Sequence, residues 1–274
     1  MPSHKLVRRR RRVAPTTIAL SVAVTLVVGF LLAPLVVVVL SSITRAGYLS
    51  FPPQGFSLQW YKAIPQHPVF LSSFITSLKL GIATTLITVV AGLLAAYGMY
   101  RYPSRLNRSL EQLFLSPLML PAVVLGIGLL FALSASGWQG TFVGVLLAHV
   151  IVAAPFVVRA SLSGLRSMDP RLEEASRSLG AGPVRTFLRV VVPTVAGSVA
   201  SGAIFAFVIS FDEAVVTLFL VGPHLSTLPV TIFTYLQYSS DPTIAAVSTI
   251  LILFCVILVA GMMRLTRSSE EHTR

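Results

Sequence analysis

MDPRLEEASRSLGAGPVRTFLRVVVP, residues 168–193, is a polar and charged stretch that lies between long apolar runs. Its first half predicts a short helix that Asp169 caps and Pro170 begins, since a proline at the first helical position loses no hydrogen bond. Gly180 ends this helix, because a residue without Cβ adopts a left-handed turn at little cost. Pro183 begins a second helix. The stretch therefore predicts two short helices joined by a glycine turn.

Each of these predicted helices has one apolar face. The residues that share a face are Leu172, Ala175 and Leu179 in the first helix and Val184, Phe187, Leu188 and Val191 in the second. Helices of about ten residues are not stable alone in water. We therefore expect the pair to dock on a surface, which is either the lipid headgroup region or another protein.

The apolar runs on both sides of this stretch define the class of protein. Of the 274 residues, 55% are hydrophobic and 11% are charged, and the charged share is well below the quarter typical of soluble domains. Six runs are long enough to cross a membrane, and they cover residues 16–40, 74–100, 110–133, 141–158, 194–221 and 243–263. The chain is expected to be an all-α polytopic membrane protein with six transmembrane helices. The first run is expected to remain as a span, because the apolar core of a signal peptide has only about 7–15 residues.

The lysine and arginine residues are concentrated in the segments that lie on one side of the predicted membrane. The N-terminal arm, residues 101–108, residues 159–189 and the C-terminal tail hold 6, 3, 6 and 3 of the 21 Lys and Arg residues. Positive residues concentrate in cytoplasmic loops, so both termini and the 168–193 stretch are predicted to face the cytoplasm. This distribution explains the net charge of +12 without nucleic acid as a partner. The single cysteine, Cys255, can form no internal disulfide.

The expected domain plan follows from these spans. A basic cytoplasmic arm covers residues 1–14, a transmembrane domain covers 15–266, and a cytoplasmic tail covers 267–274. Pro117 and Pro121 lie inside the third span and predict a kink there, since proline breaks the hydrogen-bond ladder of a helix.

Ser210, Phe211, Asp212 and Glu213 place two acidic residues inside the fifth run. At 1.5 Å per residue, Asp212 is expected roughly 12–13 Å from the outer end of the span. An ionised carboxylate near mid-membrane costs about 2.5–3.5 kcal/mol, so both acids are expected to face protein or water. In a continuous helix they point about 100° apart, so one is expected to line a pathway for a cationic solute while the other pairs with a neighbouring helix. The alternative is a structural polar contact, and His149 is likewise expected to be a packing residue rather than a ligand.

The 168–193 stretch resembles the EAA motif of ATP-binding-cassette (ABC) importer permeases, which reads Glu-Ala-Ala, three residues, Gly, nine residues and Ile-x-Leu-Pro. The matching residues are Glu174, Ala175, Ser176, Gly180, Val190 and Pro193, and the spacing is intact. Ser176 replaces the second alanine, and valines replace the isoleucine and the leucine. The resemblance implies the type I ABC importer permease fold, in which this pair of helices seats in a groove of a cytoplasmic ATPase subunit.

Residues 210–217, followed by Gly222-Pro223 and Leu228-Pro229, are similar to spermidine/putrescine permeases of the PotC type. The usual form there is Ser-Phe-Asp-Asp-Val-Val, from which Glu213 and Ala214 depart. The resemblance covers about residues 70–265, with the coupling loop at 164–193. It implies a permease of the bacterial inner membrane for polyamines. Its implied partners are a dimer of ATPase subunits, a second, related permease, an extracytoplasmic substrate-binding protein and membrane lipid.

The sequence has no Gly-x-x-x-x-Gly-Lys-Ser/Thr loop to hold nucleotide phosphates. We therefore expect that the chain itself does not hydrolyse ATP, is not an enzyme, and binds no cofactor or metal. Three alternatives remain open. They are a permease for another solute such as an opine or a phosphonate, an ion-coupled secondary transporter that uses Asp212, Glu213 and His149, and a scaffold subunit that leaves all solute contacts to the other permease.

Overall fold

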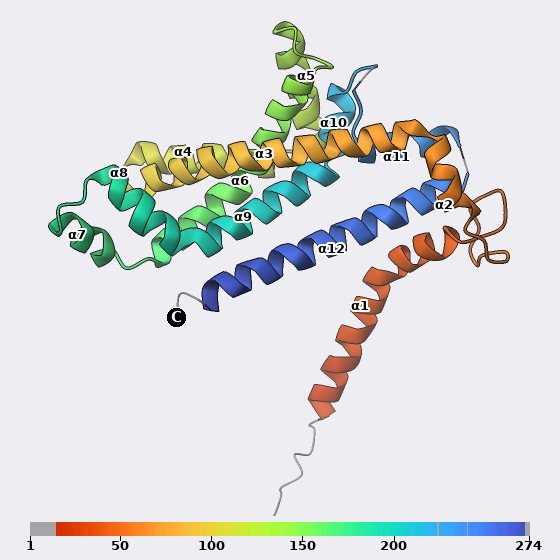
Figure 1. Cartoon of the computed structure of the whole chain (residues 1–274), viewed down its shortest axis with the longest axis horizontal. Helices are drawn as coiled ribbons and strands as arrows, with labels where there is room; N and C mark the ends of the chain where they lie inside the picture. The colour runs from red at the N-terminus through yellow and green to blue at the C-terminus, as the bar shows by residue number, and fades with distance from the viewer. Residues whose placement is uncertain (1–14, 224, 240, 272–274) are drawn as a thin grey trace, which may run out of the picture.

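The computed structural model describes residues 15–223, 225–239 and 241–271, and this part of the chain is built of helices without a strand (Figure 1). The helices are α1 (Pro15–Ser41), α2 (Gln59–Ala63), α3 (Pro68–Arg101), α4 (Arg105–Leu115), α5 (Ala122–Ala135), α6 (Phe142–Ser167), α7 (Arg171–Ser178), α8 (Pro183–Thr186), α9 (Val192–Asp212), α10 (Val215–Leu220), α11 (Leu228–Tyr238) and α12 (Thr243–Glu271), with the short turns η1 (Ile64–Gln66), η2 (Ser116–Met119) and η3 (Phe187–Val191). Five of the described helices are long and apolar enough to cross a membrane, or six if a bent pair counts as one span. The predicted all-α membrane fold is confirmed. The predicted arm at 1–14 lies outside the described residues.

Three long helices, α3, α6 and α9, pack together as the centre of the bundle (Figure 1). Glycines allow this close approach, because a Cβ at Gly92 or at Gly202 would lie only 3.0 Å from an atom of Val157. Ala206 is fully buried in a cluster with Val157. The small residues Gly202 and Ala206 of α9 therefore face α6, whereas Ser201 is exposed.

The third span is not one helix. α4 continues into η2, and this segment is bent by 109° against α5 at the break formed by Leu120 and Pro121. Pro117 lies in the first turn of η2, and Pro121 is the N-cap of α5. Leu120 is extended, with φ −89° and ψ 138°, as a residue before proline prefers to be. The predicted kink at the prolines is therefore confirmed and is as sharp as a corner, so that α5 projects from the bundle near α10 (Figure 1).

The fifth span begins earlier than predicted and is broken near its end. One helical segment runs from Pro183 to Asp212, so the second helix of the 168–193 stretch is the start of this span rather than a separate element. Its η3 part is a π-helix, whose wider turn accommodates Pro193, a residue with no N–H for the regular ladder. α9 then ends at Asp212 and α10 starts at Val215, so the expected continuous span over 194–221 is wrong.

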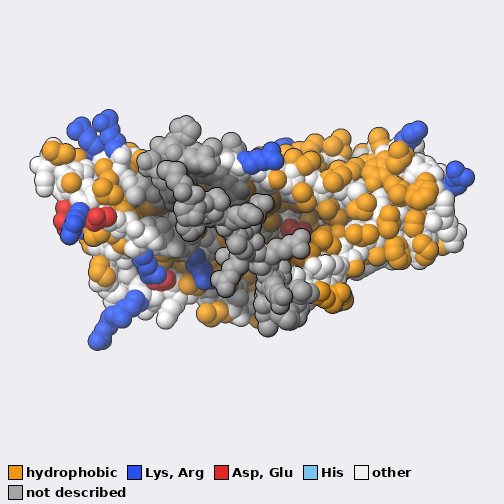
Figure 2. All heavy atoms as spheres, turned by 90° about the horizontal axis from the view of Figure 1, so that it is seen from below, with side chains coloured by type: hydrophobic (Ala, Val, Ile, Leu, Met, Phe, Trp, Pro, Cys, Tyr) orange, Lys and Arg blue, Asp and Glu red, His pale blue; other side chains and the backbone are white. Residues whose placement is uncertain are grey.

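The outer surface of the bundle is largely apolar. Figure 2 shows hydrophobic side chains over much of the visible face, with Lys and Arg mostly toward its ends. Most of α1 stands away from the other helices, and only its C-terminal end contacts α12 (Figure 1). None of the most apolar part of α1 is buried. Surfaces of this kind need lipid or another helix to cover them. α6 and α12 also extend beyond the predicted spans, to Ser167 and Glu271.

Candidate functional site

The local geometry of the 168–193 stretch agrees with its sequence. An Oδ1 atom of Asp169 accepts a hydrogen bond from the backbone N–H of Arg171 at 2.9 Å, which caps α7. Gly180 has φ +82°, the predicted left-handed conformation. The hydroxyls of Ser176 and Thr186 lie 3.0 Å apart and join α7 to α8. The two helices therefore form one elbow at an end of the bundle, which we call the coupling elbow (Figure 1).

The coupling elbow presents apolar side chains to its surroundings. Leu179, Val184 and Leu188 are 89%, 70% and 57% exposed. Val191 is fully buried and Phe187 is half-buried, so the predicted apolar face of the second helix is divided between the surface and the core. Among the residues that match the EAA motif, those exposed are Glu174, Ala175, Gly180 and Pro193, and those half-buried are Ser176 and Val190.

Two neighbouring glutamates of α7 have opposite environments. Glu174 is exposed, whereas Glu173 is 5% exposed. An Oε2 atom of Glu173 accepts a hydrogen bond from the Tyr97 hydroxyl at 3.4 Å and lies 3.9 Å and 3.6 Å from nitrogens of Arg101 and Arg177. Its Oε1 atom is buried and has no hydrogen-bond partner among the described residues. Glu173 thus attaches the coupling elbow to the end of α3.

Tyr97 of α3 contacts residues from both helices of the coupling elbow. Besides its bond to Glu173, its ring lies 4.7 Å from that of Phe187, measured between centroids. The sequence alone does not predict this contact. No local signal distinguishes Glu173 from Glu174, because which of the two is buried depends on how α7 meets α3.

The acidic segment lies at the break between α9 and α10. Ser210 and Phe211 are buried at 3% and 2% exposure, and Asp212 is exposed. Glu213 is half-buried, and its Oε1 accepts a hydrogen bond from the backbone N–H of Val216 at 2.9 Å, so it caps α10. The expected 100° separation of the two acids assumed a continuous helix, which the break removes. Asp212 is the more exposed of the two acids.

Phe211 anchors the end of α9 in an aromatic cluster. Its ring centroid lies 5.3 to 6.0 Å from those of Phe74, Phe207 and Phe254. These contacts come from α3, α9 itself and α12. They hold the last turn of α9 in place and thereby set the position of Asp212, which follows directly.

His149 of α6 bridges the break in the fifth span. Its Nδ1 lies 2.8 Å from the Ser210 hydroxyl of α9, and its Nε2 lies 2.9 Å from the Thr217 hydroxyl of α10. The Thr217 hydroxyl also donates to the carbonyl of Glu213 at 2.8 Å. His149 is 1% exposed, so both ring nitrogens are satisfied inside the protein. This is the packing role that the sequence predicts, here across two half-helices.

We expect His149→Leu to destabilise the protein by about 1–3 kcal/mol, because the change removes both hydrogen bonds and leaves buried hydroxyls unpaired. His149→Gln is the matched control, since an amide can donate and accept. The measurement is the thermal unfolding of the purified transport complex. Equal melting temperatures for the leucine variant and the wild type would contradict the bridging role.

The fold and these two sites define a class of protein. Residues 88–269 match the family model described as "Binding-protein-dependent transport system inner membrane component", and the chain belongs to this family. It is a multi-pass membrane permease subunit of an ABC importer, in which ATP is hydrolysed by a separate subunit.

Individual relatives narrow the comparison. The spermidine/putrescine transport system permease protein PotC of Haemophilus influenzae is 31% identical over 247 residues, which cover 89% of this chain and 95% of that protein. The putrescine transport system permease protein PotI of Escherichia coli (strain K12) is 29% identical over 230 residues, which cover 81% and 82%. The chain is thus similar to PotC-type permeases, as the acidic segment predicted.

Solved structures share the fold. A bacterial ABC transporter involved in the import of the acidic polysaccharide alginate has a chain that superposes with a TM-score of 0.73 at 14% identity, covering 96% of this chain and 99% of that one. A chain of the MetNI methionine ABC transporter in an inward-facing conformation has a TM-score of 0.64 at 18% identity, covering 75% and 98%. At such identities the likeness concerns the fold alone.

Proposed function

We propose that this permease imports a small organic cation, with polyamines such as spermidine and putrescine as the best candidates. The observation that carries the proposal is Asp212, which is exposed at the broken end of α9 and lies in the long apolar run of residues 194–221. Intramembrane acids mark solute pathways more often than they serve packing. Glu213 is engaged as a helix cap, so Asp212 supplies the negative charge that a cation would meet. The names of the PotC and PotI relatives support the same substrate class.

The coupling elbow is proposed to dock on the ATPase. The exposed leucines and valine of α7, α8 and η3 form the surface that the partner would cover, and the motif residues Glu174, Ala175, Ser176, Gly180, Val190 and Pro193 frame it. A protein partner is favoured over lipid because charged residues alternate with the apolar ones, as at Arg177 and Arg185. The partner would be a dimer of ABC ATPase subunits.

The remaining assembly follows from the family. A second, related permease would complete the pathway, and an extracytoplasmic substrate-binding protein would deliver the solute. The location is proposed to be the bacterial inner membrane, with both termini and the coupling elbow in the cytoplasm, as the distribution of Lys and Arg favours. The arm at 1–14, the membrane domain at 15–266 and the tail at 267–274 are kept as the domain plan.

Reconstitution tests the whole proposal. Proteoliposomes would hold the permease pair and the ATPase, with ATP at the ATPase side and the substrate-binding protein at the other. We expect ATP-dependent uptake of radiolabelled putrescine or spermidine and none of a neutral solute. Uptake of a phosphonate in place of polyamines would contradict the substrate class. Uptake driven by a proton gradient in the absence of any ATPase would contradict the importer mechanism and favour a secondary transporter.

We expect Leu179→Asp to reduce the amount of ATPase that co-purifies with the permease by about tenfold or more. A charge at the centre of an apolar contact must lose its hydration without gaining a partner, which costs at least about 1–3 kcal/mol. The control is Leu58→Asp, which places the same charge in the loop before α2 at a residue that is 62% exposed. Equal ATPase yields for both variants would show that Leu179 lies outside the contact.

A further inference from the structure

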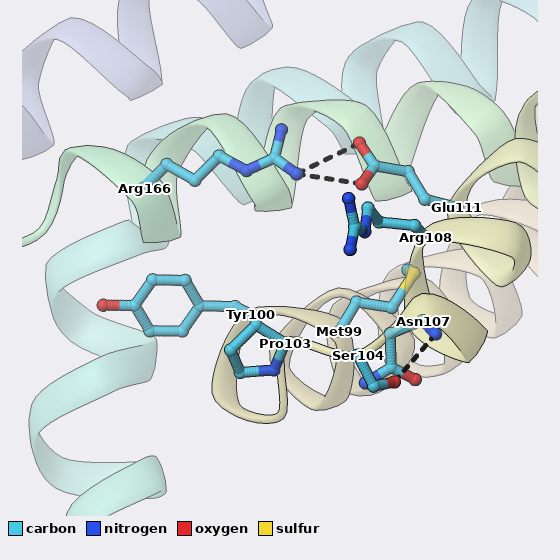
Figure 3. Close-up of a pocket in the computed structure, with 8 residues that line it drawn as sticks. All are labelled: Met99, Tyr100, Pro103, Ser104, Asn107, Arg108, Glu111 and Arg166. Carbon is cyan, nitrogen blue, oxygen red and sulfur yellow. Dashed lines mark hydrogen bonds and ion pairs between the residues drawn. The ribbon is translucent and has the colours of Figure 1, made fainter.

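α4 and α6 form a seam at the end of the bundle where α3 terminates. A cavity of about 250 Å³ opens there, and Figure 3 shows the side chains that line it. They are Met99, Tyr100, Pro103, Ser104, Asn107, Arg108, Glu111 and Arg166. The lining combines apolar side chains with polar and charged ones, and it adjoins the ends of two membrane-spanning helices. It belongs neither to the coupling elbow nor to the acidic segment.

One positive charge in this cavity is not neutralised. Arg166 donates to both carboxylate oxygens of Glu111, at 3.1 Å and 2.9 Å, so these two charges satisfy each other. Arg108 has no ion pair and no side-chain hydrogen bond within the described part of the chain. Figure 3 shows its guanidinium turned into the space between Glu111 and Met99. The cavity is therefore suited to one anionic group.

An apolar groove lies further along the same two helices. A second cavity of about 240 Å³ is lined by Leu113, Phe114, Pro117, Val150, Ile151 and Ala154, the first three from α4 and η2 and the others from α6. From Arg108 to Pro117 the chain advances about 13 Å at 1.5 Å per residue. A ligand that fills both cavities must therefore carry an anion at one end and a hydrocarbon chain at the other.

We propose that the α4–α6 seam binds an anionic phospholipid, with its phosphate on Arg108 and an acyl chain in the apolar groove. Basic pockets between membrane helices are suited to anionic headgroups. The outward face of α4 is apolar at Leu106 and Leu113, which are 69% and 65% exposed, so the groove lies beside hydrocarbon rather than beside a soluble partner. A transported cation would be repelled by Arg108. The proposal does not depend on which solute the permease carries.

The first experiment measures headgroup selectivity. The purified importer complex is titrated with phosphatidylglycerol and with phosphatidylcholine of the same chains, and bound lipid is quantified by native mass spectrometry. We expect Arg108→Gln to weaken phosphatidylglycerol binding about fivefold, the effect of one basic residue at the membrane surface. Arg105→Gln removes the same charge from a residue that does not line the cavity, and it should change binding less than twofold. Equal effects of the two variants, or equal affinity of the wild type for both lipids, would overturn the proposal.

The second experiment separates a lipid from a free anion. Ile151→Trp fills the groove from a position that is 39% exposed, and Val143→Trp adds the same ring to α6 two turns away, outside the groove. We expect only the Ile151 variant to lose phosphatidylglycerol, by about fivefold or more. Displacement of the lipid by millimolar inorganic phosphate, or unchanged binding to the Ile151 variant, would overturn the proposal in favour of a free phosphate site.

Discussion

Replacing Gly180 with leucine is expected to lower ATP-driven uptake about tenfold or more while leaving membrane insertion intact. Gly180 has φ +82°, and an L-residue in this region costs roughly 1–2 kcal/mol. Two hydrogen bonds depend on the turn, from the N–H of Gly180 to Arg177 and from that of Ala181 to Ser176, at 2.9 and 3.1 Å. Relaxing the backbone would break them and change the angle between α7 and α8. Uptake into proteoliposomes, normalised to inserted permease, is the measurement.

The matched control for this substitution is Gly180→Asn. A Cβ at Gly180 would meet no atom within 4 Å, so lack of space is not the obstacle. Asparagine tolerates the left-handed conformation better than leucine does. We therefore expect the asparagine variant to keep most of its uptake. If the leucine variant transports as well as the wild type, the glycine turn does not determine how the coupling elbow docks.

Asp212→Asn is expected to reduce the uptake of a polyamine about tenfold or more at substrate concentrations below saturation. The amide keeps the shape of the side chain and removes its charge. Two opposite charges about 4 Å apart attract by roughly 4 kcal/mol at an effective dielectric constant of about 20, before desolvation is counted. A tenfold loss is about 1.4 kcal/mol and is therefore a conservative expectation.

Glu213→Gln is the control for the Asp212 substitution. Its side-chain oxygen already accepts from the backbone of Val216, and a glutamine oxygen can do the same. We expect a much smaller effect on uptake and none on substrate selectivity. If Asp212→Asn leaves both uptake and substrate-stimulated ATP hydrolysis unchanged, this subunit serves as a scaffold and the other permease makes the contacts with the solute.

Local rules predicted the parts of the structure that depend on neighbours in the sequence. The Asp169 cap and the Gly180 turn are formed within a few residues, so their residue types were sufficient to place them. The long apolar runs likewise specify spans, since only a helix satisfies the backbone within the membrane. The prolines of the third span indicated a break, yet the 109° angle depends on how α5 packs against α10.

Features that depend on distant contacts were not predictable in this way. α9 ends at Asp212 although no proline or glycine interrupts the apolar pattern there. His149 holds the two half-helices across the break, and it lies more than 60 residues earlier in the chain. Glu173 is buried only because Tyr97 and Arg101 of α3 face it. Such partners become visible only once the helices are placed in space.

The attachment of Glu173 to Tyr97 has a mechanical consequence. α3 has 34 residues and is one uninterrupted helix, roughly 51 Å long at 1.5 Å per residue. At its far end the Ser73 hydroxyl lies 2.7 Å from that of Thr231, and Ser77 accepts from the backbone of Leu228 at 2.8 Å. α3 is thus a single long helix that is held by side-chain contacts at both ends. We therefore expect a displacement of the coupling elbow to be transmitted along α3 to α11 at the opposite end of the bundle, without passing through a loop.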